Sequence, residues 1–307
     1  MAYDAVLLIA FGGPEKMEDV RPFLANVTKG RPIPPQRLDE VARHYELFGG
    51  RSPLNAMTFR QATALQMLLE HEGPRLPVYV GMRNWHPYLH ETLAKMSTDG
   101  VTQALGFILS AQQSEAGWQR YQQNVAEACV QVGPSAPRID YVDEWHAHPL
   151  FIETVADLTG QALTQVPSAR RSETPLVFTA HSVPTALSST LLYVRQIEEG
   201  ARLVAERLGH AVWSVAYQSR SGDPRTPWLE PDISVVLWQL AEKKTENVVV
   251  SPIGFVCDHI EVLYDLDTEA RHIAEQLGIN MIRAAAVNDH PTFIRMMAEV
   301  VRKATDK

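Results

Sequence analysis

The stretch AVLLIAF (residues 5–11) is an unbroken apolar run that ends at the glycine pair of FGGPE (11–15). A run of this length, bounded by a glycine turn, predicts a strand buried on both faces, as in a parallel sheet. Seven more stretches of strand length follow it: VYVGM (78–82), ALGFILS (104–110), RIDYV (138–142), PLVFTAH (175–181), VWSVAYQ (212–218), NVVVSPIGF (247–255) and NMIRAAAV (280–287). Helical patterns lie between them, at residues 87–97, 113–131, 149–165, 194–208, 233–243 and 260–277. This alternation predicts right-handed βαβ units and parallel sheets covered by helices on both faces.

Four of the expected strands precede about residue 148 and four follow it. We therefore expect an α/β fold of two Rossmann-like domains of similar size. The segment GRPIPPQR (30–37) interrupts the first half, and its three prolines argue against regular helix or central strand there. A helical stretch at 38–47 follows it. Because ligands bind beyond the carboxyl ends of the strands in open α/β sheets, we expect the chemistry in the loops at those ends.

Composition narrows the classes of protein that fit. The chain has 307 residues, of which 45% are hydrophobic, and a formal net charge of −8, which argues against nucleic acid as a partner. No apolar stretch reaches the length of a membrane span, and the N-terminus lacks the basic region of a signal peptide. Cys129 and Cys257 lie far apart and fit no zinc pattern. We expect free thiols in a reducing cytoplasm, and two cysteines cannot supply the four ligands of an all-cysteine iron–sulfur cluster.

His181 follows the apolar stretch PLVFT at the expected end of a strand. A histidine at such an end can present a neutral nitrogen to a metal or accept a proton near pH 7. Taken alone, a histidine that only bonds the backbone is the simpler interpretation.

Glu261, Asp265 and Glu269 recur every four residues in HIEVLYDLDTEA (259–270). On an α-helix they share one face, about 6 Å apart along the axis. Like charges at this spacing repel each other, so the row destabilises the helix unless a cation compensates. One interpretation is a solvated face near a helix N-terminus, where the helix dipole favours acidic residues. The other is a path that passes a hydrated divalent cation along oxygen ligands.

Several motifs resemble those of ferrochelatases, in order and at the spacing of that family. They are LLIAFGGPEKMEDVRPFL (7–24), YELFGGRSPL (45–54), FTAHSVP (178–184), YQSRSGDPRTPWLEPD (217–232) and PIGFVCDHIEVLYDLDTEA (252–270). The resemblance implies two Rossmann-like domains with a porphyrin cleft between them. It also implies that the C-terminal helix (291–305) returns to the first domain, which gives domains of 1–148 with 290–307, and of 149–289.

The resemblance assigns roles to the acidic row and to the histidine. It implies that His181 and Glu261 face each other across the cleft as the catalytic pair, and that both bind the metal. Asp265 and Glu269 match the acidic path that leads outward from that glutamate. Fe²⁺ is then a substrate, and no tightly bound cofactor is expected.

The short, proline-rich segment before FGGRSPL resembles that of soluble coproporphyrin III ferrochelatases of bacteria. Thr28 and His44 stand where arginines often lie, and Phe11 stands where many soluble members carry a tyrosine that ligates the product iron. Lys29, Arg31 and Arg43 are nearby cations that suit the four propionates of coproporphyrin III. The residues expected to contact the porphyrin are Phe11, Thr28, Lys29, His44, Tyr45, Ser52, Tyr121 and Trp228.

The expected function is therefore Fe²⁺ insertion into coproporphyrin III in the cytoplasm, with handover of the product to a downstream enzyme of the haem pathway. Three alternatives stay open. They are a protoporphyrin IX ferrochelatase, a related chelatase that loads cobalt or nickel into a tetrapyrrole, and a non-catalytic haem or tetrapyrrole carrier. Phe11 motivates the carrier, whereas His181 with a complete acidic row argues against it, because a carrier needs no path for metal delivery.

Overall fold

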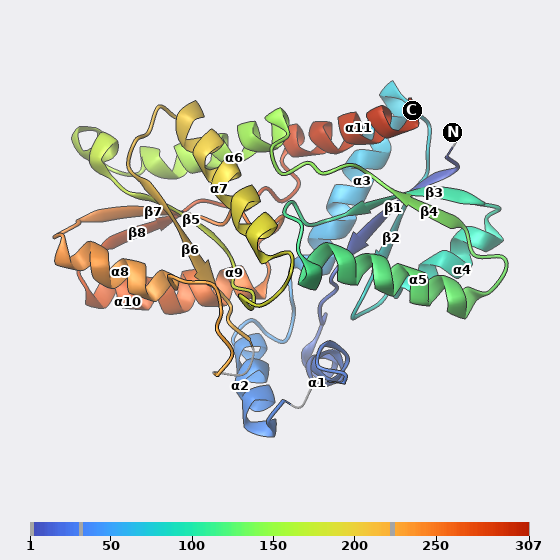
Figure 1. The fold of residues 1–307 in the computed structure, drawn as a ribbon, viewed down its shortest axis with the longest axis horizontal. Coiled ribbons are helices and arrows are strands. Elements are labelled where there is room, and N and C mark those ends of the chain that lie inside the picture. The colour runs from blue at the N-terminus through green and yellow to red at the C-terminus, as the bar shows by residue number, and fades with distance from the viewer. Residues whose placement is uncertain (1–2, 31–32, 222–224, 307) are drawn as a thin grey trace. The chain divides into compact units, whose positions relative to one another are not determined.

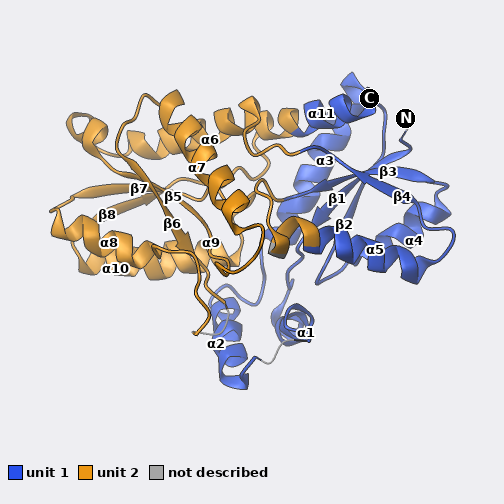
Figure 2. Cartoon of the chain, in the orientation of Figure 1, with its two compact units in different colours: residues 1–109, 120–143, 297–307 blue, residues 110–119, 144–296 orange. Residues whose placement is uncertain are grey.

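The computed structural model describes residues 3–30, 33–221 and 225–306 of the chain. Over this part the chain forms two compact units, which Figure 2 colours separately. Unit 1 comprises residues 1–109, 120–143 and 297–307, and unit 2 comprises residues 110–119 and 144–296. The domain borders expected at residues 148 and 290 stay a prediction.

The described part of unit 1 contains a parallel sheet of four strands in the order β2-β1-β3-β4. The strands are β1 (Ala5–Ala10), β2 (Val78–Met82), β3 (Gln103–Ile108) and β4 (Arg138–Tyr141). All residues of β1 are buried, as its apolar sequence requires for a central strand of a covered sheet. The helices are α1 (Met17–Val27), α2 (Pro35–Glu46), α3 (Leu54–Glu72), α4 (Leu89–Thr98) and α5 (Arg120–Val132). Helix α11 (Pro291–Thr305) begins in unit 2 and ends in unit 1.

Unit 2 contains, among its described residues, a second parallel sheet of four strands in the order β6-β5-β7-β8. The strands are β5 (Leu176–His181), β6 (Trp213–Gln218), β7 (Asn247–Ser251) and β8 (Asn280–Arg283). The helices α6 (Pro149–Thr164) and α7 (Thr190–Arg207) cover one face, and α8 (Ile233–Glu242) and α10 (Arg271–Gln276) cover the other (Figure 1). A short 3₁₀ helix, η2 (Ser168–Glu173), precedes β5. Both sheets confirm the predicted α/β class with two Rossmann-like units.

Two of the expected helices are not continuous α-helices. The stretch expected at 113–131 begins with a π-helix, η1 (Glu115–Gln119), before α5. The stretch expected at 260–277 consists of α9 (Ile260–Tyr264), the π-helix η3 (Asp265–Ala270) and α10. A π-helical turn forms its backbone hydrogen bonds between residues five apart, which rotates every later residue around the helix axis. The pattern of apolar residues gives no clear sign of such a turn.

The proline segment gives another difference. Helix α2 begins inside GRPIPPQR, with Pro34 at its N-cap and Pro35 in its first turn. Proline is tolerated in the first turn because the N–H group there has no helical partner anyway. The prediction that all of this segment is irregular is therefore wrong from Pro35 onward.

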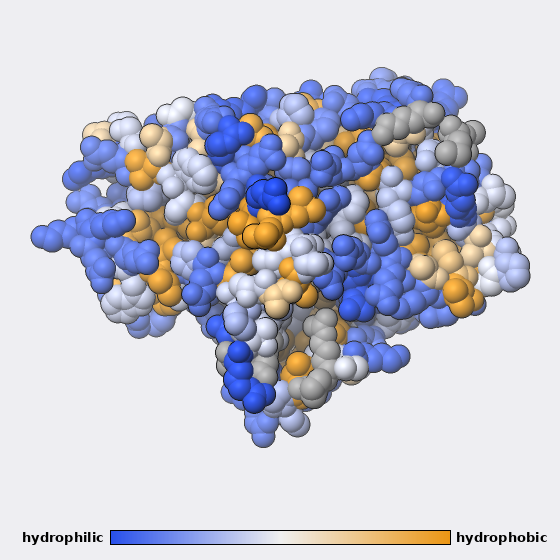
Figure 3. All heavy atoms as spheres, viewed as in Figure 1, coloured by the Kyte–Doolittle hydropathy of each residue, from blue (hydrophilic) through white to orange (hydrophobic). Residues whose placement is uncertain are grey.

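Among the described residues no helix is both long enough and apolar enough to span a membrane. Figure 3 shows hydrophilic residues over most of the visible face, with apolar residues in smaller groups between them.

Candidate functional site

His181 is the last residue of β5, whose neighbours in the sheet are β6 and β7. The next strand in the chain, β6, lies on one side of β5, and the strands after it, β7 and β8, lie on the other side. The direction in which strands are added therefore reverses at β5. In open α/β sheets the crevice at the carboxyl end of such a strand is where ligands bind. His181, the histidine singled out in the sequence, therefore lies at the position of unit 2 where the topology favours ligand binding.

Hydrogen bonds fix the orientation of the His181 ring. Its Nδ1 lies 2.5 Å from the carbonyl oxygen of Ser182, and its own carbonyl oxygen accepts from the buried hydroxyl of Tyr193 at 3.0 Å. Because a carbonyl only accepts, the neutral ring carries its proton on Nδ1 and leaves Nε2 with a lone pair. The tautomer thus presents Nε2 as a metal ligand or proton acceptor.

Glu261 lies in the first turn of α9 and faces the histidine. Its Oε2 is 3.9 Å from Nε2 of His181, and the two side chains are 45% and 30% exposed, respectively. This separation exceeds a hydrogen bond. The structure therefore brings the predicted pair together within unit 2 without pairing the two groups to each other, and it leaves both open to a ligand.

Asp265 is the first residue of the π-helix η3, and its carboxylate accepts a hydrogen bond from the hydroxyl of Ser219. Burial raises the pKa of Asp265 to about 7, the Ser219 hydrogen bond opposes this shift, and the charges of Glu261 and Glu269 add to it. The three carboxylates thus remain close enough to interact although the helix between them is not regular. Like charges this close repel one another, and carboxylate oxygens are groups that a divalent cation can bind.

His259 is a further histidine at this site that the sequence reasoning did not single out. It is the N-cap of α9, and its Nδ1 accepts the backbone N–H of Glu261 at 3.1 Å. Burial lowers the pKa of His259, and the charges of Glu261 and His181 also act on it. Its place directly before the first residue of the acidic helix is the sequence signal that marks it.

Within the described residues no group of three or more His, Cys, Asp or Glu side chains is arranged to hold a metal ion by itself. His181 and Glu261 are therefore a facing pair, and Asp265 and Glu269 follow Glu261 on the same helical segment.

In unit 1, Phe11 follows β1 and belongs to an aromatic cluster around Phe23. The ring centroids of Phe11 and Tyr45 lie 6.3 Å and 5.7 Å from that of Phe23. The guanidinium of Arg83 lies over the rings of Phe11 and Tyr121, at 5.4 Å and 5.1 Å. Unit 1 thus gathers three of the residues expected to contact porphyrin.

The other expected contacts in unit 1 are more dispersed. The hydroxyl of Thr28 donates to the carbonyl of Leu24 in its own helix at 2.7 Å, and Lys29 is exposed just beyond α1. His44 is half-buried on α2, and burial lowers its pKa. Ser52 is buried beside Gly13, where a Cβ would lie only 2.7 Å from the Cβ of Ser52, which explains the glycine.

Trp228 and Arg31 are two more of the residues singled out in the sequence. Trp228 pairs with Pro184 in an isolated antiparallel bridge, so it lies beside the turn that follows His181 in unit 2. Arg31 lies outside the described residues.

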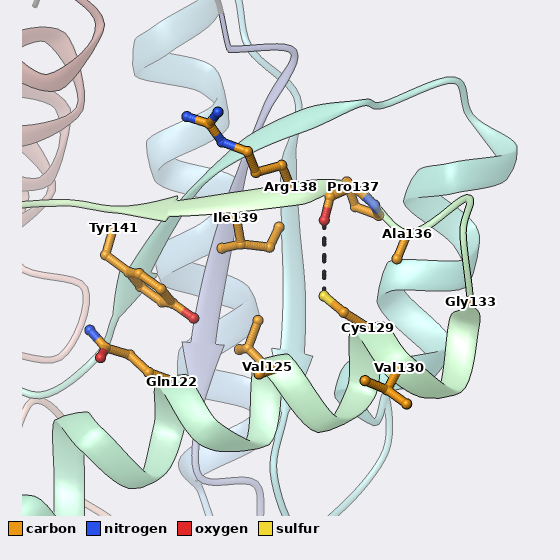
Figure 4. Close-up of a pocket in the computed structure, with 11 residues that line it drawn as sticks. Gln122, Val125, Cys129, Val130, Gly133, Ala136, Pro137, Arg138, Ile139 and Tyr141 are labelled. Atoms are coloured by element: carbon orange, nitrogen blue, oxygen red, sulfur yellow. Dashed lines mark hydrogen bonds between the residues drawn. The ribbon is translucent and has the colours of Figure 1, made fainter.

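A surface hollow of unit 1 has no part in this site. It has a volume of about 620 Å³ between α5 and the edge strand β4, and its lining includes Val125, Cys129 and Ile139 (Figure 4). None of the expected site residues lines it. Burial raises the pKa of the Cys129 thiol, so this cysteine is held in its less reactive, protonated form.

A family model and several known proteins match nearly the whole length of the chain. The family model of ferrochelatases matches residues 3–305. A coproporphyrin III ferrochelatase of Nocardia farcinica is 46% identical over 314 residues, which covers 100% of this chain and 89% of that protein. One of Mycolicibacterium smegmatis is 44% identical, covering 98% of this chain and 89% of that protein. A ferrochelatase of Rhodopirellula baltica is 42% identical, covering 99% and 87%.

Solved structures agree at the level of the fold. SirB from Bacillus subtilis with Fe³⁺ superposes with a TM-score of 0.61 at 12% identity, covering 99% of this chain and 96% of that one. CbiX, described as the terminal enzyme of sirohaem biosynthesis in denitrifying bacteria, gives a TM-score of 0.51 at 15% identity, covering 98% and 99%. With a family match over nearly its whole length and relatives of 42–46% identity, the chain belongs to the ferrochelatase family.

Proposed function

We propose that this chain inserts Fe²⁺ into coproporphyrin III to give the iron porphyrin coprohaem, in haem biosynthesis. The observation that carries the proposal is the spacing of 3.9 Å between Nε2 of His181 and Oε2 of Glu261. An ion about 2.1 Å from each of two ligand atoms can join atoms up to about 4.2 Å apart. One first-row divalent ion therefore fits between the two groups. The names of the bacterial relatives support the choice of porphyrin.

The reaction replaces two pyrrole N–H protons by Fe²⁺, so two protons have to be accepted near the centre of the macrocycle. Nε2 of His181 has one lone pair in the tautomer set by Ser182, so it accepts a proton only after the ion has moved from it to the macrocycle. The carboxylate of Glu261 is the second acceptor. Because both side chains are partly exposed, protons taken from the porphyrin can pass on to water.

Asp265 and Glu269 are proposed to bring the ion to this pair. The half-buried carboxyl of Asp265, with its pKa near 7, exchanges a proton for a cation near neutral pH. Oxygen ligands suit a hydrated divalent ion, and His181 then offers the nitrogen that competes for Fe²⁺ as water leaves.

The porphyrin itself is proposed to contact the residues expected from the sequence. The rings of Phe11, Tyr45 and Tyr121 offer apolar surface to the macrocycle, and Trp228 adds another ring beside the turn after His181. Lys29 is an exposed cation suited to a propionate. Thr28, His44 and Ser52 are the proposed polar contacts. Phe11 has no atom that ligates iron, so the axial ligand of the product has to come from elsewhere.

We also propose a cytoplasmic location, no resident cofactor, and handover of the product to a downstream enzyme of the haem pathway. The cysteines Cys129 and Cys257 are both free thiols, which suits a reducing compartment.

The test is an anaerobic insertion assay with Fe²⁺, in which coproporphyrin III and protoporphyrin IX are supplied in parallel. We expect turnover with coproporphyrin III and slower turnover with protoporphyrin IX. Faster turnover with protoporphyrin IX would overturn the assignment of coproporphyrin III as the substrate. Preference for Co²⁺ or Ni²⁺ in a competition assay would overturn the assignment of Fe²⁺. Tight haem binding without any insertion would favour the non-catalytic carrier instead.

A further inference from the structure

Gln218 is the last residue of β6 and is only 1% exposed. In the parallel ladder its Cα partner is His181 on β5. Partner residues on neighbouring strands direct their side chains to the same face of a sheet. Gln218 and His181 therefore leave the sheet edge in the same direction, toward the helical segment that carries Glu261.

The amide of Gln218 binds the main chain of Glu261. Its Nε2 donates to the carbonyl oxygen of Glu261 at 2.9 Å. Since that carbonyl only accepts, the bond also assigns which end of the amide is nitrogen. The neighbour of the histidine in the sheet is thus tied directly to the residue that bears the facing carboxylate.

Glu261 is held on both sides of its Cα by this arrangement. Its N–H donates to Nδ1 of His259, and its carbonyl accepts from Gln218. The opposite partner is held as well, because the backbone and ring of His181 are bonded to Tyr193 and Ser182. Of these bonds, the one from Gln218 links the strand edge of His181 to the backbone of Glu261.

The oxygen of the Gln218 amide indicates that this residue does more than fill space in the core. Its Oε1 is buried and has no hydrogen-bond partner among the residues that the structure describes. An unpaired buried amide oxygen is unfavourable, and an apolar side chain of similar size fills such a place without that cost. Fold stability alone therefore favours methionine or leucine here, whereas a role in the geometry of the site explains a glutamine.

The next residue, Ser219, strengthens the same link. Successive residues of a strand point to opposite faces, but Ser219 has φ 62, in the left-handed region that serine rarely adopts. In this conformation its hydroxyl reaches the carboxylate of Asp265, four residues after Glu261. Strained backbone of this kind persists where surrounding structure enforces it, often at functional sites. Gln218, at the end of β6, and Ser219, directly after it, thus bind the acidic segment at Glu261 and at Asp265.

We propose that Gln218 is a positioning residue, which sets the spacing of the two proposed metal ligands by tethering the main chain of Glu261 to the strand beside His181. The inference rests on the proposed function, in which His181 and Glu261 bind the metal.

The test measures metal affinity and turnover separately in Gln218→Met. This variant keeps the length of the side chain and removes its N–H donor. Co²⁺ is the probe, and its visible absorption reports binding in the absence of porphyrin. Outer partners of metal ligands typically contribute about 10- to 100-fold to metal affinity or activity. We expect Co²⁺ affinity to fall by about 10- to 100-fold, the KM for Fe²⁺ to rise similarly, and porphyrin affinity to change less than about twofold.

Thr159→Val is the matched control, because Thr159 is also buried and ties α6 to Ser251 of β7 by a side-chain bond of 2.8 Å. It should keep wild-type Co²⁺ affinity. If Gln218→Met does not fold, Gln218→Leu carries the test, since it also fills the site with an apolar side chain, lacks the donor and adds no charge beside the metal pair. Unchanged Co²⁺ affinity in the Gln218 variant, or an equal loss of affinity in Thr159→Val, overturns the proposal.

His181→Ala, measured in parallel, separates the two claims. If it loses Co²⁺ affinity while Gln218→Met does not, the positioning role fails and the proposed function stands. If His181→Ala binds Co²⁺ like the wild type, the proposed metal pair itself fails.

Discussion

Replacing Asp265 by asparagine tests the electrostatics of the acidic row in the metal-free protein. Burial raises the pKa of this carboxyl from 3.8 to about 7. Between these values the folded protein holds a proton that the unfolded chain has released. The folded state therefore binds more protons, and the free energy of unfolding must fall as pH rises from about 4 through about 7.

The size of this fall follows from the shift. About three pKa units at roughly 1.4 kcal/mol each give about 4 kcal/mol, an upper value because the side chain is partly exposed. Asparagine has no proton to release, so the contribution is absent from Asp265→Asn. We expect the wild type to lose about 2–4 kcal/mol relative to the variant between pH 4 and pH 8.

Urea unfolding followed by circular dichroism, at constant ionic strength and with a chelator present, gives the free energy at each pH. Subtracting the variant from the wild type removes the contributions of the titrating groups that do not interact with Asp265. A difference that stays constant within about 0.5 kcal/mol across this range would mean that Asp265 is ionised throughout and that its pKa is not raised.

Two further substitutions test other parts of the structure. Arg283→Met should destabilise the protein by about 3–5 kcal/mol in urea unfolding, because the 13%-exposed Arg283 side chain pairs with Asp258 and Asp267 at 2.6 Å and 2.7 Å. Its loss removes the cation beside Asp258 and leaves Asp267 with the longer contact to Arg271 at 3.4 Å; a loss below about 1 kcal/mol contradicts this. Gly13→Ala should cost about 1–3 kcal/mol in the same assay, since the new Cβ would lie 2.7 Å from the Cβ of Ser52, and a neutral result would mean that the loop moves aside freely.

The sheets of this protein were predictable because their strands are short apolar runs bounded by turns. Burial on both faces removes the polar alternation of exposed strands and leaves a simple signal, as in β1 and β5. His181 was predictable for a related reason, since the strand ends where the apolar run stops. The ferrochelatase motifs then supplied its partner, Glu261.

The details around the acidic row were not predictable from periodicity. The expected α-helix placed Asp265 and Glu269 at regular steps after Glu261, whereas η3 is a π-helix. Whether a turn takes an extra residue depends on tertiary contacts, such as the hydrogen bond from Ser219 to Asp265.

Contacts between distant segments were also outside the reach of the sequence. Gln218 and Glu261 are 43 residues apart, and only the packing of α9 against the end of β6 brings them together. The hydroxyl of Thr28 bonds the carbonyl of Leu24 in its own helix, as threonine commonly does, and its contact with the porphyrin stays a prediction.

His181 and Glu261 are proposed to act together on the metal, and the kcat of single variants for iron insertion into coproporphyrin III shows whether they do. His181→Ala and Glu261→Gln should each lower kcat by at least about 100-fold, in line with the contribution of a positioned acid–base group, while coproporphyrin still binds. His272→Ala, which removes an exposed histidine of α10, serves as the control and should turn over like the wild type. Near-wild-type kcat in either His181→Ala or Glu261→Gln would contradict the account.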